Sequence, residues 1–222
     1  MLKKIHQTFT DHLFYPLALS SLLASLFLSF RIYYFKNYSY LFLFWNLFLA
    51  WIPYGCSLLF LYLHHHFSIK WRFLSPLFFI WLFFFPNAPY ILTDFWHLRE
   101  RYPVPLWYDL GLLISFSWSG CLLAFASLNS IQDLLDKKVG KIISWTFTLA
   151  VIGFSGFGIY LGRFLRWNSW DLILEPSYLY QELIREILDR KTHPQVVGFT
   201  TMFSLILITN YFVFRGIQRR RE

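Results

Sequence analysis

Long apolar runs separated by short polar segments dominate the chain. Six of these runs are close to the ~20 residues that an α-helix needs to cross the hydrocarbon core of a bilayer. Each run is expected to be helical, because a bilayer offers no water to unpaired backbone groups. The sequence therefore predicts an all-α polytopic membrane helix bundle with spans at Phe14–Tyr34, Tyr40–Leu63, Phe73–Leu92, Trp107–Leu128, Ile142–Leu161 and Val196–Phe214.

The longest polar connection, residues 163–193, has a pattern of its own. Between Ser177 and Arg190, apolar residues recur at helical spacing and charged residues fall between them. Such a stripe is typical of a helix that lies on a membrane surface or against a bundle. We therefore expect one amphipathic surface helix besides the six spans, all within a single integral membrane domain, residues 1–222.

The composition supports a membrane protein. The chain is 57% hydrophobic and 14% charged, whereas soluble domains carry about 25% charged residues. The formal net charge of +8 does not indicate nucleic-acid binding, because the basic residues gather at the ends of the predicted spans, where they contact anionic headgroups. The expected partners are membrane lipids, and the two cysteines exclude a disulfide framework.

An even number of spans places both termini on the same side of the membrane. Lys3 and Lys4 precede the first span, and a basic tail at 215–221 follows the last one. Positive residues at span ends favour the cytoplasmic side. We expect both termini in the cytoplasm.

Three polar clusters fall at span ends that this topology assigns to the outer face. The first is FPNAPYILTDFWHL at 85–98, the second is WYD at 107–109, and the third is GIYLGRFLRWNSWD at 158–171. Segments far apart in the sequence thus bring acids, an imidazole and arginines to one membrane depth. We predict that they form one site.

The side chains in these clusters suit phosphate recognition and acid–base chemistry. Guanidinium groups bind phosphate oxygens through paired hydrogen bonds. Asp94 and His97 are three residues apart, so one helical turn places them on the same side, where the carboxylate can orient the imidazole as a general acid or base. The candidate catalytic residues are Asp94, His97 and Asp109, and the candidate substrate-binding residues are Asn87, Arg163, Arg166, Asn168 and Asp171.

Each candidate residue also has a purely structural interpretation. Asp109 can complement the dipole of the helix that it begins. The two arginines can satisfy terminal carbonyls or extend to the headgroups, and Asn168 and Asp171 can cap a helix. The amide of Asn87, between two prolines, can pair with the backbone groups that the prolines free.

Two further patterns bear on the site. Gly158, Gly162 and Arg166 are spaced at four, which predicts one helical stripe for close packing against a neighbouring helix or a ligand. Asp94, His97 and Asp109 could instead bind zinc or manganese. The main hypothesis assigns no metal to the site and identifies no cofactor.

Several stretches resemble a known family. They are FPNAPYILTDFWHL, WYDLGLLISFSWSGCLLAF at 107–125, GFGIYLGRFLRWNSWDL at 156–172 and NLFLAWIPY at 46–54. Together they are similar to the bacterial polytopic membrane proteins called domain of unknown function 1361. The resemblance implies a multi-span protein of the bacterial cell membrane and brings no established activity or catalytic residue.

The functional hypothesis is a pocket at the outer membrane face that binds an anionic lipid or a lipid-linked phosphate. Acid–base chemistry on that substrate would make the protein an enzyme, which the sequence leaves undecided. The alternatives are a transporter or flippase of such a substrate and a non-catalytic structural or regulatory membrane subunit. A transporter usually carries ionisable groups near the bilayer midplane, and here the span centres are almost free of charge.

Overall fold

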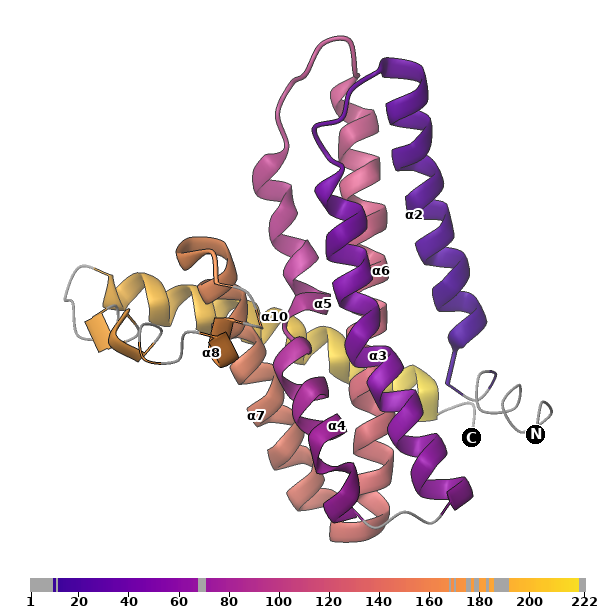
Figure 1. The fold of residues 1–222 in the computed structure, drawn as a ribbon, viewed down its shortest axis with the longest axis vertical. Coiled ribbons are helices and arrows are strands. Elements are labelled where there is room, and N and C mark those ends of the chain that lie inside the picture. Colours follow the sequence, from indigo (N-terminus) through magenta and orange to yellow (C-terminus); the bar gives the residue numbers. More distant parts are fainter. Residues whose placement is uncertain are drawn as a thin grey trace. The chain divides into compact units, whose positions relative to one another are not determined.

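The computed structural model describes residues 10, 12–67, 71–167, 169, 171–174, 177, 180–182, 184–185 and 192–219. These residues form helices joined by short connections (Figure 1). The one strand-like pairing among them is an isolated bridge between Arg101 and Val104. The prediction of an all-α fold is confirmed.

The chain divides into two compact units, Met1–Asp133 and Leu134–Glu222. The first unit contains α2 (Phe14–Phe35), α3 (Phe42–Phe67), α4 (Trp71–Phe84), α5 (Asn87–Tyr90), the 3₁₀-helix η1 (Ile91–His97) and most of α6 (Leu106–Val139). The second unit contains the end of α6, α7 (Lys141–Tyr160), the π-helix η2 (Leu161–Leu165), α8 (Asp171–Leu174) and α10 (His193–Arg219). The expectation of one domain over 1–222 stays a prediction.

Six helical segments among the described residues are long and apolar enough to cross a membrane, as the sequence predicts. The helix α6 is longer than its predicted span, with 34 residues. At 1.5 Å per residue it is about 51 Å long, whereas the hydrocarbon core is about 30 Å thick. Its last turns, which carry Asp136, Lys137 and Lys138, therefore extend beyond the apolar layer.

The third span differs from its prediction. The predicted span ends at Leu92, whereas the chain continues helically to His97 through α5 and η1. Pro86 is the N-cap of α5 with φ −60°, and Pro89 lies in the first turn of α5, where a helix needs no backbone N–H. The prolines therefore interrupt the hydrogen-bond ladder and leave a candidate span of Phe73–His97.

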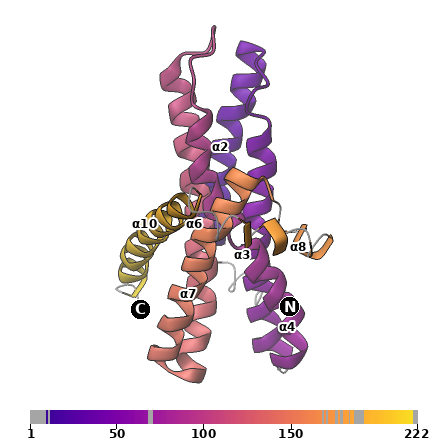
Figure 2. The same ribbon diagram turned by 90° about the vertical axis from the view of Figure 1, so that its left-hand side faces the viewer.

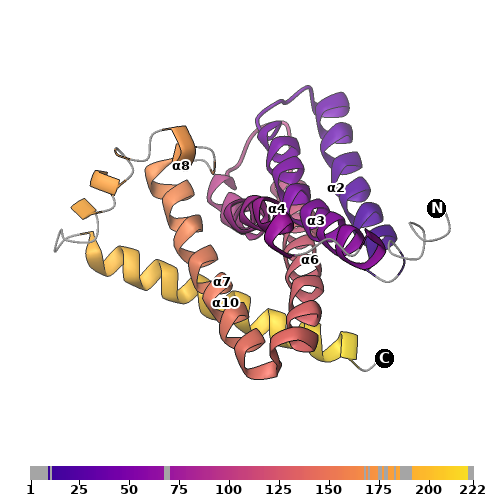
Figure 3. The ribbon, with the colours of Figure 1, turned by 60° about the horizontal axis from the view of Figure 1, so that its bottom comes forward.

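Polar side chains connect the helices of the first unit across an otherwise apolar core. The indole Nε1 of Trp81 donates to Ser127 Oγ at 2.7 Å, and this hydroxyl donates to the carbonyl of Pro53 at 3.1 Å. The chain of contacts links α4, α6 and α3, and α4 lies beside α3 in Figure 3. Hydrogen bonds between membrane helices contribute about 0.6 kcal/mol each, so this pair favours the observed register of the three helices modestly.

A glycine on α6 allows α5 to approach closely. A Cβ atom added at Gly120 would lie 2.5 Å from the carbonyl oxygen of Ala88 and 3.0 Å from Cδ1 of Ile91. Near this contact, Ser117 Oγ donates to the carbonyl of Ile91 at 3.1 Å. The two contacts place the polar segment of η1 directly against α6.

In the second unit, α7 packs against α10 and crosses it (Figure 2). A Cβ atom at Gly156 would lie 2.4 Å from Ser204 Oγ and 2.8 Å from the carbonyl oxygen of Thr200. Trp145 stacks on Phe212 at 4.8 Å between ring centroids. At one end of the pair, Asp136 accepts hydrogen bonds from Arg215 at 2.7 Å and Arg219 at 3.2 Å. Small residues and ring stacking hold this helix pair together.

The predicted surface helix, Ser177–Arg190, lies largely outside the described residues, and so do Leu183 and Ile187 of its apolar stripe. One contact of this segment is described. Trp167 Nε1 donates a hydrogen bond to Glu182, which ties the segment to the chain that leaves η2.

Candidate functional site

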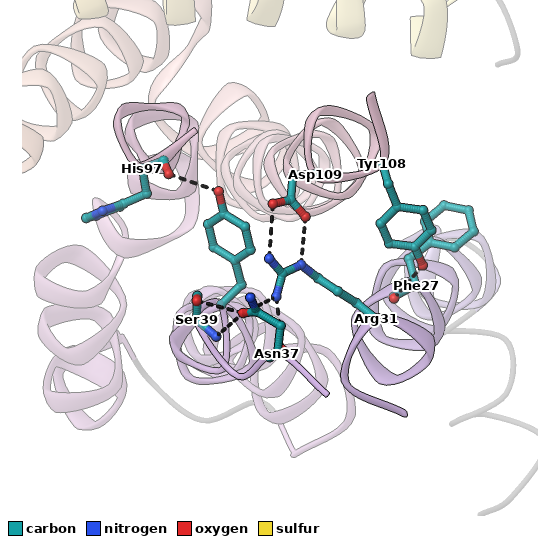
Figure 4. A network of polar contacts seen from close by, with 8 residues as sticks. Phe27, Arg31, Asn37, Ser39, His97, Tyr108 and Asp109 are labelled. Atoms are coloured by element: carbon teal, nitrogen blue, oxygen red, sulfur yellow. Dashed lines mark hydrogen bonds and ion pairs between the residues drawn. The ribbon is translucent and has the colours of Figure 1, made fainter. Parts of the chain in front are cut away.

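Arg31 and Asp109 form a buried ion pair in the first unit (Figure 4). Arg31 Nε donates to Asp109 Oδ1 at 2.6 Å, and Nη2 donates to Oδ2 at 3.0 Å. The two side chains are 0% and 1% exposed. Because an isolated buried charge is costly, each group depends on the other.

The turn after α2 completes the contacts of this arginine. Lys36 ends α2 in the left-handed conformation, and its N–H donates to the carbonyl of Ile32 at 3.0 Å. Arg31 Nη1 then donates to the carbonyl oxygen of Asn37 at 3.0 Å and to its Oδ1 at 2.9 Å. The same Oδ1 accepts from Ser39 N and Oγ. The turn is therefore built around the guanidinium (Figure 4).

Tyr40 links this pair to a second arginine. The Tyr40 side chain is fully buried, and the guanidinium carbons of Arg31 and Arg101 lie 4.7 and 4.5 Å from its ring centroid. Its hydroxyl donates to the carbonyl of His97 at 2.9 Å. Burial raises the pKa of the phenol above its ordinary 10.0, although both arginines lower it. The phenol therefore keeps its proton and acts as a donor. We call Arg31, Asn37, Tyr40, Arg101 and Asp109 the Arg31 network.

Asp94 lies on η1 and is buried, with 1% exposure. Asn46 of α3 donates from Nδ2 to Asp94 Oδ2 at 2.8 Å. The neighbouring Thr93 donates from its hydroxyl to the carbonyl of Tyr90 at 2.7 Å. The carboxylate thus lies between η1 and α3.

His97 and Asp109 do not face each other. The imidazole packs edge-on against Phe42, with 5.1 Å between ring centroids, and in Figure 4 it points away from Asp109. Both oxygens of Asp109 accept hydrogen bonds from Arg31. Both oxygens are therefore occupied by the guanidinium and are not directed at a substrate. This geometry favours the structural interpretation of Asp109, and Asp94 and His97 remain as acid–base candidates.

The metal alternative has no geometric support. Among the described residues, which include Asp94, His97 and Asp109, no group of three or more His, Cys, Asp or Glu side chains could hold a metal ion.

Asn87 has a contact of the kind that its structural interpretation predicts. Its Nδ2 donates to the carbonyl of Phe84, the last residue of α4, at 3.1 Å. The amide therefore satisfies a backbone oxygen at the break between α4 and α5.

The remaining candidates belong to the second unit. Arg163 lies in the π-helix η2, and Arg166 follows it in the left-handed conformation, with φ 59° and ψ 30°. The predicted stripe of Gly158, Gly162 and Arg166 is therefore wrong, because a π-helical turn changes the register and Arg166 leaves the helix. Asp171 begins α8, and Asn168 lies outside the described residues. A site that unites these residues with Asp94 stays a prediction.

The family comparison agrees with the resemblance carried by the polar clusters. The model of a family described as "Protein of unknown function (DUF1361)" matches residues 45–209. The chain belongs to this family. Comparisons with curated proteins and with solved structures found no match. With its six candidate spans, this DUF1361 protein is an integral membrane protein of unknown activity.

The DUF1361 match divides the Arg31 network. It begins at residue 45, so Arg31, Asn37 and Tyr40 precede the matched region, whereas Arg101 and Asp109 lie within it. All eight candidate site residues are also within it. The helix α2 therefore supplies a cation to a carboxylate of the DUF1361 region.

Sequence reasoning missed Arg31, Tyr40 and Arg101 as parts of one network. It treated Arg31 and Arg101 only as basic residues at the ends of predicted spans. A signal for Arg31 was present, since it is a lone cation inside the apolar run FLSFRIYY, and an ionisable residue within a span usually has a partner. No sequence signal distinguished Asp109 from other acids as that partner.

Proposed function

We propose that this DUF1361 protein binds an anionic lipid or a lipid-linked phosphate at one membrane face, and that Arg166 contacts the phosphate. The proposal rests on the exposure of Arg166, on its backbone conformation and on its lack of a side-chain partner among the described residues. It is exposed and adopts the left-handed conformation without being glycine. Among the described residues no side chain forms a hydrogen bond or an ion pair with it.

The backbone around Arg166 supports a functional role for this position. The left-handed conformation costs a non-glycine residue about 1–2 kcal/mol, and such outliers gather at binding and catalytic sites. π-Helical turns such as η2 are also frequent at functional sites. The N–H of Trp167 donates back to the carbonyl of Leu161 at 3.3 Å, which closes the turn and directs the chain away from α7.

The rest of the predicted binding set would assist Arg166. Arg163 is half-buried in η2 and would add a second cation, and Asn87, Asn168 and Asp171 complete the set as proposed. In a catalytic version of the function, His97 would transfer a proton and Asp94 would hold its orientation. Both oxygens of Asp109 accept from Arg31, so Asp94 is the carboxylate that we propose for this role.

Binding at one face is better supported than transport across the membrane. The buried charged residues among those described are Arg31, Asp94, Asp109 and Arg215. Each lies in the first or last turns of its helix or in η1, and transporters place such groups near the bilayer midplane. A transporter or flippase and a structural subunit stay as the alternatives.

The test compares lysine with alanine at Arg166. The purified protein is incorporated in nanodiscs, and the retention of phosphatidylglycerol over phosphatidylcholine is measured by native mass spectrometry. We expect Arg166→Lys and Arg166→Ala each to weaken anionic lipid binding about five- to tenfold, because an ammonium lacks the paired donors of a guanidinium. Arg185→Ala is the matched control, since Arg185 is an exposed arginine of the same unit. Wild-type binding by Arg166→Lys at normal abundance would contradict the proposal.

A further inference from the structure

We infer a second anion-binding site, in the first unit, where Arg101 receives an oxyanion of the phosphate class beside Tyr40. It goes beyond the proposed function, because Arg163 and Arg166 take no part in it. The anion is either the phosphate of a lipid headgroup or a free phosphate, since both present the same oxygens to a guanidinium.

The position of Arg101 is fixed at both its backbone and its side chain. Its carbonyl oxygen accepts the N–H of Val104 at 2.8 Å, which closes a tight turn between η1 and α6. Its guanidinium carbon lies 4.5 Å from the centroid of the Tyr40 ring. A guanidinium on an aromatic face keeps its N–H groups in the plane of the group, where they can bond to oxygens. The side chain is thus oriented before any ligand arrives.

One donor atom of Arg101 has no acceptor among the described residues. Its Nη1 is buried and has no hydrogen-bond partner among the described residues. No described carboxylate forms an ion pair with it. A buried donor of a charged group without an acceptor is unfavourable, and an oxyanion supplies the missing acceptor and the missing charge.

Arg31 has a carboxylate counterion in the protein, and Arg101 has none among the described residues. Both guanidiniums contact the same ring, and Arg31 is neutralised by both oxygens of Asp109 (Figure 4). Asn37 accepts from the remaining Nη1 of Arg31. The single carboxylate of the Arg31 network, Asp109, is therefore committed to Arg31. The positive charge of Arg101 is left for a ligand.

The surroundings of Arg101 favour an anion with access from the membrane surface. Arg101 is partly exposed, and its neighbours Arg99 and Glu100 are exposed. Lys36 lies over the Tyr33 ring at 4.8 Å, in the turn that also carries Asn37. The turns at 36–41 and 98–105 carry three cations, Lys36, Arg99 and Arg101, and one anion, Glu100. Both turns join candidate spans, so they lie at the depth of lipid headgroups.

The first experiment uses the unaltered protein. Phenylglyoxal modifies accessible arginines, and mass spectrometry reads Arg99 and Arg101 separately. In an uncharged detergent, inorganic phosphate is added. In nanodiscs without added phosphate, phosphatidylglycerol replaces phosphatidylcholine. We expect protection of Arg101 and not of Arg99. Protection by phosphate in detergent identifies a free anion, and protection only by phosphatidylglycerol identifies a lipid headgroup.

Two variants with the same change in charge provide the second measurement. We expect Arg101→Gln to weaken binding of the protecting anion about tenfold, equivalent to ~1.4 kcal/mol, and Arg99→Gln to leave it unchanged. Equal protection of both arginines, or equal loss in both glutamine variants, would show a general effect of surface charge and overturn the inference. Absence of protection in detergent and in nanodiscs would overturn it as well.

Discussion

Arg31 Nε and Asp109 Oδ1 lie 2.6 Å apart, although 78 residues separate the two in the sequence. The pair joins the last turns of α2 to the first turn of α6, and neither side chain reaches solvent. A second bond between Nη2 and Oδ2 fixes the relative rotation of the two groups. The contact therefore acts as a specific connection between these two helices.

The loss of one partner of this pair should destabilise the first unit strongly. We expect Arg31→Leu and Asp109→Leu each to lower the free energy of unfolding by about 3–5 kcal/mol, because the remaining charge stays buried without a counterion. Thermal unfolding of the purified protein in detergent measures the effect.

The double variant provides the control for this prediction. Arg31→Leu combined with Asp109→Leu should recover much of the loss, since no unpaired charge remains. Additive losses in the double variant would show that the two residues act separately.

The approach of α5 to α6 should depend on the absence of a side chain at Gly120. Gly120→Ala would place a Cβ atom 2.5 Å from the backbone oxygen of Ala88, and a backbone atom cannot move aside easily. We expect a loss of about 1–3 kcal/mol in the free energy of unfolding. Gly111→Ala on the same helix meets nothing within 4 Å and should be neutral or stabilising by up to ~1 kcal/mol. Equal effects of the two substitutions would contradict this packing.

The α7–α10 pair offers a parallel test in the second unit. Gly156→Ala would bring a Cβ atom to 2.8 Å from the carbonyl oxygen of Thr200, so α10 must shift away. Gly153→Ala, three residues earlier on α7, meets nothing within 4 Å. We expect Gly156→Ala alone to increase hydrogen exchange of the amides of 196–207. Unchanged exchange in that variant would mean that α10 does not depend on this contact.

The orientation of the protein can be tested with single cysteines in a variant that lacks Cys56 and Cys121. We expect a maleimide that cannot cross membranes to label Tyr102→Cys in intact cells, because Tyr102 is 99% exposed in a turn assigned to the outer face. Arg219→Cys should react only after permeabilisation, because basic termini favour the cytoplasm. Labelling of Arg219→Cys in intact cells would reverse the assignment.

The sequence predicts the helices well and the polar contacts poorly. Apolar runs determine which segments cross a membrane, so all six spans were predicted, with errors mainly at their ends. The third span was predicted to end at Leu92, where the apolar run stops, and the polar residues from there to His97 were not predicted as part of the span.

For the candidate site, the sequence indicated several polar residues but not their partners. Asp94, Asp109 and Asn87 were chosen because polar residues interrupted apolar runs, and each has a specific contact in the structure. Their partners depend on how helices rotate and slide against each other. Hydrophobic pattern alone does not determine these movements, so Asn46 and Arg31 could not be paired with the two acids in advance.

The long sequence separation within the Arg31–Asp109 pair has a consequence for biosynthesis. Arg31 is made 78 residues before Asp109, which at 5–20 residues per second is a delay of roughly 4–16 s. During this time α2 has left the ribosome while its counterion does not yet exist. A lone guanidinium favours the hydrated headgroup layer over the hydrocarbon core, so we expect α2 to keep its Arg31 end in that layer until α6 is present. We therefore expect α6 to set the final depth of α2.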